Sequence, residues 1–166
     1  MPCICEQMAG GKIPLSPVCL GDLWVFSNLA PEEIEELSRD AKRQQLEKGQ
    51  ALFRQADPAD EMFLIKAGRV RLNKIFEDGS QITLDFRKAG DVVGENMLSE
   101  QGTFPVDAIC MEDTLTCGFT RETFEQKILA YPNIGLQIIK NLSDRINQLT
   151  SRVSSLAASN IEDRLY

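Results

Sequence analysis

The residues best suited to chemistry are the five cysteines, because the chain contains no histidine. They are Cys3, Cys5, Cys19, Cys110 and Cys117. In a reducing compartment such thiols are rarely paired in disulfides, and they are more often buried and inert, metal-bound or redox-active. The absence of histidine removes the commonest general base, the commonest metal ligand and the usual haem ligand. The sequence therefore predicts thiolate chemistry or no site chemistry at all.

The other polar residues form no recognisable catalytic constellation. There is no nucleophile motif, no glycine-rich phosphate loop ahead of a helix and no pair of carboxylates at a recognisable site. The acids of Glu32-Glu33 and Glu35-Glu36 are most simply a solvated helix face. We expect a protein that is not an enzyme.

Composition and charge narrow the functional class further. The 166 residues are 43% hydrophobic and 26% charged, as in ordinary globular proteins. The net charge of −7 and the lack of a basic stripe argue against a nucleic-acid surface in this segment. No signal peptide and no run long enough to span a bilayer are present. These features predict a cytoplasmic protein that does not bind membranes.

The sequence divides into three segments, and these determine where the cysteines lie. Residues 1–21 lack periodicity and predict an irregular, cysteine-containing arm. Residues 22–131 predict a β-roll with flanking short helices, the first of which opens at Pro31 with acidic residues behind it. Short strands follow, separated by glycines about every ten residues, and Glu77-Asp78-Gly79 is a hairpin signal. The expected strands include Ala51–Phe53, Met62–Ile65, Val70–Ile75 and Gln81–Phe86, of which the last two alternate as half-buried strands do.

The end of the sequence predicts helices. Thr120 is a candidate cap for a short helix that ends near Tyr131-Pro132. A dimerisation helix is expected over residues 132–160, with its regular pattern ending at about Ala158. Its apolar residues are spaced 3, 4, 3, 4, 3 as in a heptad seam, with β-branched residues at a and leucine at d: Ile139, Leu142, Ile146, Leu149, Val153 and Leu156.

Two interpretations of this seam are open. The stripe could pack on the β-roll of the same chain, or it could pair with a second copy. A globular docking face usually widens beyond a and d, whereas the flanks here are polar. This favours a parallel homodimer. We expect Leu136 and Ile138 to pack back onto the roll.

Several motifs resemble the sensor domain of the Crp/Fnr family. Ile65-Lys66-Ala67-Gly68-Arg69-Val70-Arg71-Leu72 is similar to a family turn, and Ala89-Gly90-Asp91-Val92-Val93-Gly94-Glu95 resembles the signature that opens the effector pocket. The resemblance implies a double-stranded β-helix (jelly-roll) of the cyclic-nucleotide-binding type plus a long C-terminal dimerisation helix. It covers residues 22–166, and residues 161–166 resemble the start of the hinge to a helix-turn-helix domain.

The resemblance also implies an effector pocket. Its expected residues are Gly94, Glu95, Asn96, Met97, Pro105 and Val106. In family members that bind cyclic nucleotides, an arginine and a hydroxyl residue hold the phosphate, and here those positions fall at Pro105 and Val106. Neither offers a side-chain donor, and Asp107 would repel a phosphate. Binding of cAMP is therefore disfavoured.

The Fnr branch of the family holds an iron–sulfur cluster on cysteines. Cys117 resembles its late ligand, and Cys3, Cys5 and Cys19 would complete the four thiolates. The spacing departs from the family, because Cys3-Ile4-Cys5 is a C-x-C motif. Zinc on the same thiolates, haem without histidine and a small organic ligand remain alternatives. Cys110 is more simply a buried hydrophobe.

Together these features predict the sensor and dimerisation domain of a bacterial transcription regulator, which responds to oxygen, NO or redox state if the cluster is present. DNA would be bound by a helix-turn-helix domain not present in this chain, and RNA polymerase is a further candidate partner. The alternative is a stand-alone interaction module that binds a small ligand or a cyclic nucleotide and has no DNA-binding role.

Overall fold

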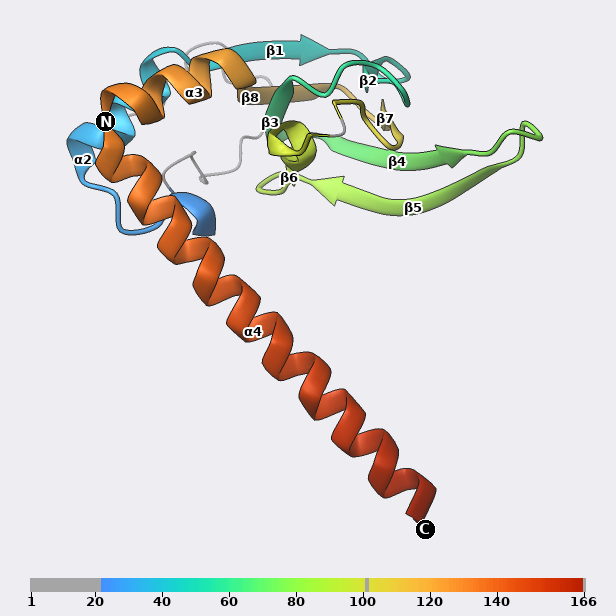
Figure 1. Cartoon of the computed structure of the whole chain (residues 1–166). Coiled ribbons are helices and arrows are strands. Elements are labelled where there is room, and N and C mark those ends of the chain that lie inside the picture. Colours follow the sequence, from blue (N-terminus) through green and yellow to red (C-terminus); the bar gives the residue numbers. More distant parts are fainter. Residues whose placement is uncertain (1–21, 101, 166) are drawn as a thin grey trace.

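The strands form two antiparallel sheets that face each other as a roll. The computed structural model describes residues 22–100 and 102–165 (Figure 1). Within them, one sheet has the order β1 (Lys42–Leu46), β8 (Thr114–Thr120), β3 (Glu61–Ala67) and β6 (Val92–Val93). The other has the order β2 (Ala51–Phe53), β7 (Asp107–Cys110), β4 (Arg69–Ile75) and β5 (Gln81–Lys88). The predicted mainly-β jelly-roll is confirmed.

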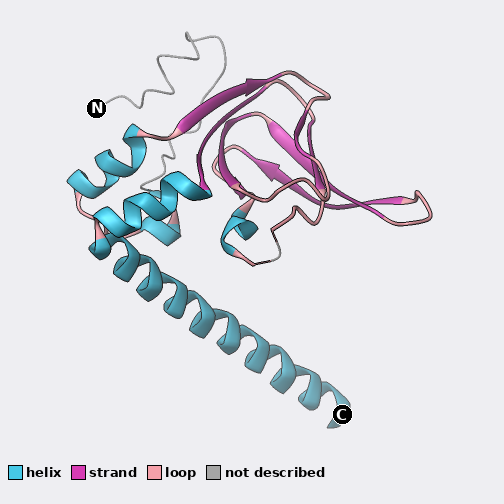
Figure 2. Cartoon of the chain, turned by 45° about the horizontal axis from the view of Figure 1, so that its top comes forward, coloured by secondary structure: helices cyan, strands magenta, loops and turns pink. Residues whose placement is uncertain are grey.

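The buried residues separate into two clusters. The roll core lies between the sheets and is built around Phe53, Phe63 and Phe104, with the rings of Phe53 and Phe104 stacked at 3.8 Å between centroids. The helix-side core lies where the helices cover the first sheet and includes Phe119 and Phe124. Figure 2 shows most of the helices, including the start of the long last one, gathered on one side of the strands.

Short helices close the end of the roll. They are η2 (Trp24–Phe26), α2 (Pro31–Arg39) and α3 (Arg121–Ala130), while η3 (Glu95–Leu98) follows β6. Both expected helix starts are confirmed. The Glu33 carboxylate accepts the backbone N–H of Ala30 at 2.9 Å ahead of α2, and the Thr120 hydroxyl accepts the N–H of Thr123 at 3.1 Å at the start of α3.

The predicted hairpin is also confirmed. It joins β4 to β5 through Gly79, whose φ of 82° is one that glycine adopts without strain. The expectation that β5 is half-buried is wrong, because Ile82, Leu84 and Phe86 are 45–57% exposed. The alternation is present, but β5 is the edge strand of its sheet and no described element covers that face.

The last helix, α4 (Pro132–Leu165), has 34 residues and is therefore about 50 Å long. It projects away from the roll (Figure 1). It extends beyond the predicted end near Ala158 and includes residues 161–165, for which the resemblance implies the start of a hinge. Position 166 lies outside the described residues. No helix within the described ranges combines the length and the apolarity needed to cross a bilayer.

Candidate effector site and dimerisation helix

The residues expected to form the effector pocket surround a cavity of about 280 Å³ between the sheets. We call it the roll pocket; its lining residues are Phe53, Leu72, Leu84, Asp85, Arg87, Val93, Gly94, Asn96, Pro105 and Val106. Four of the six expected residues, Gly94, Asn96, Pro105 and Val106, lie here. The side chain of Glu95 lies outside the described residues.

Backbone geometry at Gly94 sets the entrance of this pocket. Gly94 has a φ of 81° and precedes η3, and a Cβ on it would meet the Glu61 carbonyl oxygen at 2.5 Å. Only glycine fits this turn without a shift of the neighbouring strand. The turn is held on its other side by Asn96, whose side-chain amide donates to the Thr103 carbonyl at 3.2 Å.

Sequence reasoning missed the cation of the roll pocket. Arg87 reaches it from β5 and forms an ion pair with Asp85, with 3.0 Å between Nε and Oδ2. It also donates to the Val92 carbonyl at 3.2 Å. The i, i+2 spacing of Asp85 and Arg87 places both on one face of a strand, and this was the signal available in the sequence.

The structure gives Asp107 a different position from the one expected. Asp107 is buried and accepts the backbone N–H of Gln55 at 2.7 Å. Its other oxygen lies 3.2 Å from Nη1 of Arg54. The expectation that this carboxylate repels a phosphate in the pocket is therefore wrong, because Asp107 does not line the roll pocket.

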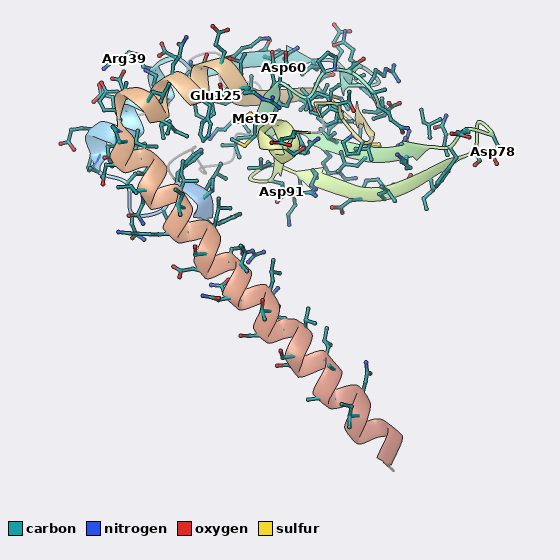
Figure 3. The ribbon with its side chains drawn as sticks, in the orientation of Figure 1. Arg39, Asp60, Asp78, Asp91, Met97 and Glu125 are labelled. Carbon is teal, nitrogen blue, oxygen red and sulfur yellow. The ribbon has the colours of Figure 1, made fainter. Side chains whose placement is uncertain are left out.

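A second, larger cavity lies between the roll and α4. We call it the helix-side cavity; it has a volume of about 520 Å³ and is lined by Leu23, Trp24, Val25, Phe26, Met62, Arg87, Gly90, Asp91, Val92, Met97, Phe124, Ile138, Leu142 and Arg145. The sixth expected pocket residue, Met97, is fully buried and lines this cavity instead of the roll pocket. Figure 3 shows Met97 on the side of η3 that faces the helices.

Of the proposed cluster ligands, the structure describes one. Cys117 lies in β8, is 4% exposed and belongs to the helix-side core. Cys3, Cys5 and Cys19 lie outside the described residues, and within the described part no three or more Cys, Asp or Glu side chains gather as a metal site. Cys110 lies in the roll core, as expected of a buried hydrophobe. Burial raises the pKa of the Cys110 thiol.

The apolar seam of α4 does not pack on its own roll. All six predicted seam residues are exposed, by 40% at Leu142 and by up to 66% at Val153 and Leu156. Ile138 is buried against the helix-side core as expected, whereas Leu136 is exposed and that expectation is wrong. Within the described residues, packing on the roll therefore does not account for the exposed seam.

One buried polar residue fastens the base of α4 to the segment that follows the arm. The side-chain amide of Asn141 donates to the carbonyls of Val25 at 2.9 Å and Ser27 at 3.1 Å. One turn later, the guanidinium of Arg145 lies 5.6 Å from the centroid of the Trp24 ring. These contacts join η2 and the residue that follows it directly to α4.

Comparison with known proteins identifies the fold. The model of the cyclic nucleotide-binding domain matches residues 43–131. The fumarate and nitrate reduction regulatory proteins of Yersinia pestis and Escherichia coli (strain K12) are 27% and 26% identical over 160 residues. The match covers 96% of this chain but only 64% of the length of those relatives.

Solved structures agree with this match. The N-terminal domain of a transcriptional regulator from Streptomyces coelicolor A3(2) has a TM-score of 0.72 at 19% identity, over 80% of this chain and 94% of that one. The sensor domain of the transcriptional regulator DNR from Pseudomonas aeruginosa has 0.66 at 20%, over 80% and 89%. The Thermus thermophilus catabolite activator protein has 0.65 at 26%, over 81% and 63%. The chain belongs to the cyclic nucleotide-binding domain family, and it is similar to the N-terminal part of regulators of the Crp/Fnr type.

Proposed function

We propose that this domain senses an effector and dimerises within a DNA-binding transcription regulator. The observation that carries the proposal is the exposed seam on α4, because an apolar stripe of regular a/d spacing on a projecting helix is costly unless a partner covers it. A parallel pair of such helices fixes the geometry of whatever is attached beyond them. The relatives named above are regulators.

The size of the seam suits a stable dimer. Burying one half-exposed Leu, Ile or Val side chain stabilises by about 1 kcal/mol. Six such side chains from each of two copies contribute on the order of 10 kcal/mol, which is comparable to the free-energy cost of association. Additional contacts beyond the seam would then set the affinity, and we expect a dimer at micromolar concentration.

The test is a double substitution, Ile146→Glu and Leu149→Glu. Buried carboxylates without partners would oppose pairing, so sedimentation should show a folded monomer where the unaltered protein is a dimer. The matched control is Asn147→Glu with Ser151→Glu, which adds the same charge outside the seam and should remain dimeric. A dimer in the first variant would show that the seam is not the interface.

For the effector we propose an iron–sulfur cluster on Cys3, Cys5, Cys19 and Cys117, which would respond to oxygen, NO or redox state. The proposal is supported by the short stretch of chain that separates Cys19 from the core containing Cys117. Leu23 belongs to the same buried core as Cys117, and the four residues from Cys19 to Leu23 span at most about 14 Å. When bound, the cluster would supply the redox-sensitive group, and Cys117 would hold it from within the helix-side core. Zinc or haem would give a different absorption spectrum.

Cyclic AMP is not part of the proposal. Pro105 and Val106 line the roll pocket but offer no side-chain donor to a phosphate. Among the described lining residues the one cation is Arg87, which is already paired with Asp85. A phosphate there would have to compete with a carboxylate for the guanidinium.

DNA and RNA polymerase are proposed partners of the whole regulator. We assign DNA contact to a helix-turn-helix domain outside these 166 residues, because the segment carries a net charge of −7. The alternative, a stand-alone interaction module without a DNA role, predicts no such domain. The natural reading frame after Tyr166 separates the two.

A further inference from the structure

The helix-side cavity has the composition of a ligand site. Its volume of about 520 Å³ lies within the range of small-molecule pockets. Most of its lining is apolar and includes the buried side chains of Phe26, Met97 and Phe124. A molecule that binds here must therefore have a largely apolar body.

The charge of the cavity favours an anionic end on that molecule. Two arginines and one aspartate line it. Arg87 already pairs with Asp85, and the Asp91 carboxylate accepts the Lys88 N–H at 2.9 Å. Arg145, by contrast, has no carboxylate within 4.0 Å among the described residues; its contacts are the Trp24 ring and a long 3.5 Å hydrogen bond to Gln148. A half-buried guanidinium next to an apolar space can hold a carboxylate or sulfonate group.

The position of the cavity connects such a ligand to the dimerisation helix. Ile138, Leu142 and Arg145 form the α4 wall, and Leu142 is also a residue of the seam. The opposite wall includes Leu23 to Phe26, which Asn141 fastens to α4. A ligand between these walls contacts both elements and biases their packing.

We propose that the helix-side cavity is a site for a small organic anion with an apolar body, of the class of medium-chain carboxylates, and that Arg145 binds its anionic group. The cavity shares Arg87 with the roll pocket, and its apolar walls belong to the helix-side core that also contains Cys117. Its link to dimerisation rests on the proposed function, whereas binding itself does not.

The experiment uses octanoate as the probe and 1-octanol as its uncharged counterpart. Trp24 is the single tryptophan of the chain and lines the cavity, so octanoate should change its emission in a saturable way, while calorimetry gives the Kd. Arg145→Gln should weaken octanoate binding about tenfold, as expected for the loss of a charge-assisted hydrogen bond, and should leave octanol binding unchanged. Arg152→Gln, one heptad further along α4, is the matched control and should bind as the unaltered protein does.

The outcomes separate clearly. Absence of saturable heat and of any change in Trp24 emission at millimolar octanoate would overturn the site. Equal octanoate binding in the Arg145 and Arg152 variants would overturn the assignment of the anion to Arg145, and with it the proposal. The titration is repeated on the Ile146→Glu, Leu149→Glu variant. Binding there by a monomer supports the site on its own, and a dimer there contradicts the seam without affecting the site.

Discussion

Cys110 and Cys117 lie on consecutive strands but in different cores, and this makes them a matched pair for testing the cluster. Both are buried. Burial raises the pKa of the Cys110 thiol, so that this thiol stays protonated at neutral pH and is a poor metal ligand. Cys117 belongs to the core that also holds Leu23, at the end of the arm.

We expect Cys117→Ser to abolish the visible absorption of anaerobically reconstituted protein, and Cys110→Ser to leave it unchanged. Serine is close in size to cysteine, so that both variants should fold, which far-UV circular dichroism checks. The proposal predicts bound iron and sulfide in the Cys110 variant. A colourless unaltered protein, or equal absorption in both variants, would argue against the cluster.

Single residues also show where sequence reasoning fails. Pro105 and Val106 lie in the roll pocket, as the resemblance implied for the phosphate positions of the family. The same resemblance implied Met97 as well, but Met97 turns into the helix-side cavity, since one residue of a short helix can face either side. The i, i+2 spacing of Asp85 and Arg87 places both residues on one face of β5, but the sequence does not show that this face meets the pocket.

Among the elements, α2 and α3 are held together by a triad of charges. The Lys127 ammonium lies 2.6 Å from an Asp40 oxygen and 2.7 Å from a Glu36 oxygen. These carboxylates, Asp40 first, raise the pKa of Lys127. A raised lysine pKa stabilises the fold fully below its unfolded value of about 10.4, and this stabilisation is lost as pH rises through the folded value.

Lys127→Met should therefore lower the free energy of unfolding by about 1–2 kcal/mol at pH 8, a figure that allows for solvent screening at the half-exposed Asp40. The difference from the unaltered protein should shrink as pH rises above the ordinary lysine pKa of about 10.4 and Lys127 loses its charge. Urea unfolding across this pH range measures the difference. Lys140→Met, which changes an exposed lysine of α4, is the control and should have little effect. A loss of stability that does not change with pH would show that Lys127 stabilises the fold through packing and not through its charge.

Helix starts could be predicted because their signals lie within a few residues. The burial of a strand could not be predicted, because it depends on the position of that strand in the sheet. Thr120 and Pro31 gave the helix starts because caps act within one turn. The alternation of β5 gave a strand, but its burial depended on the edge position in the sheet. The end of α4 was placed too early because the heptad pattern fades after Leu156 while the backbone remains helical.

At the scale of the molecule, the net charge of this chain is unsuited to DNA binding. It carries 25 acidic and 18 basic residues, and a dimer doubles the resulting net charge of −7. Affinity for DNA depends on cations that displace counterions from the phosphates. Two negatively charged copies would instead be repelled, most strongly at low salt, where the screening length is longest.

The isolated 166-residue dimer should therefore not bind duplex DNA, even at low salt and micromolar protein. Fluorescence anisotropy of a labelled duplex, repeated at raised salt, measures this, since phosphate contacts weaken steeply with salt. A protein extended to include a basic helix-turn-helix domain should bind duplex DNA. In that protein, the Ile146→Glu, Leu149→Glu substitutions should weaken binding to a palindromic site, because a monomer cannot contact both half-sites together. Salt-sensitive binding by the isolated domain would instead place a nucleic-acid surface within these residues, and the division of labour proposed here would be wrong.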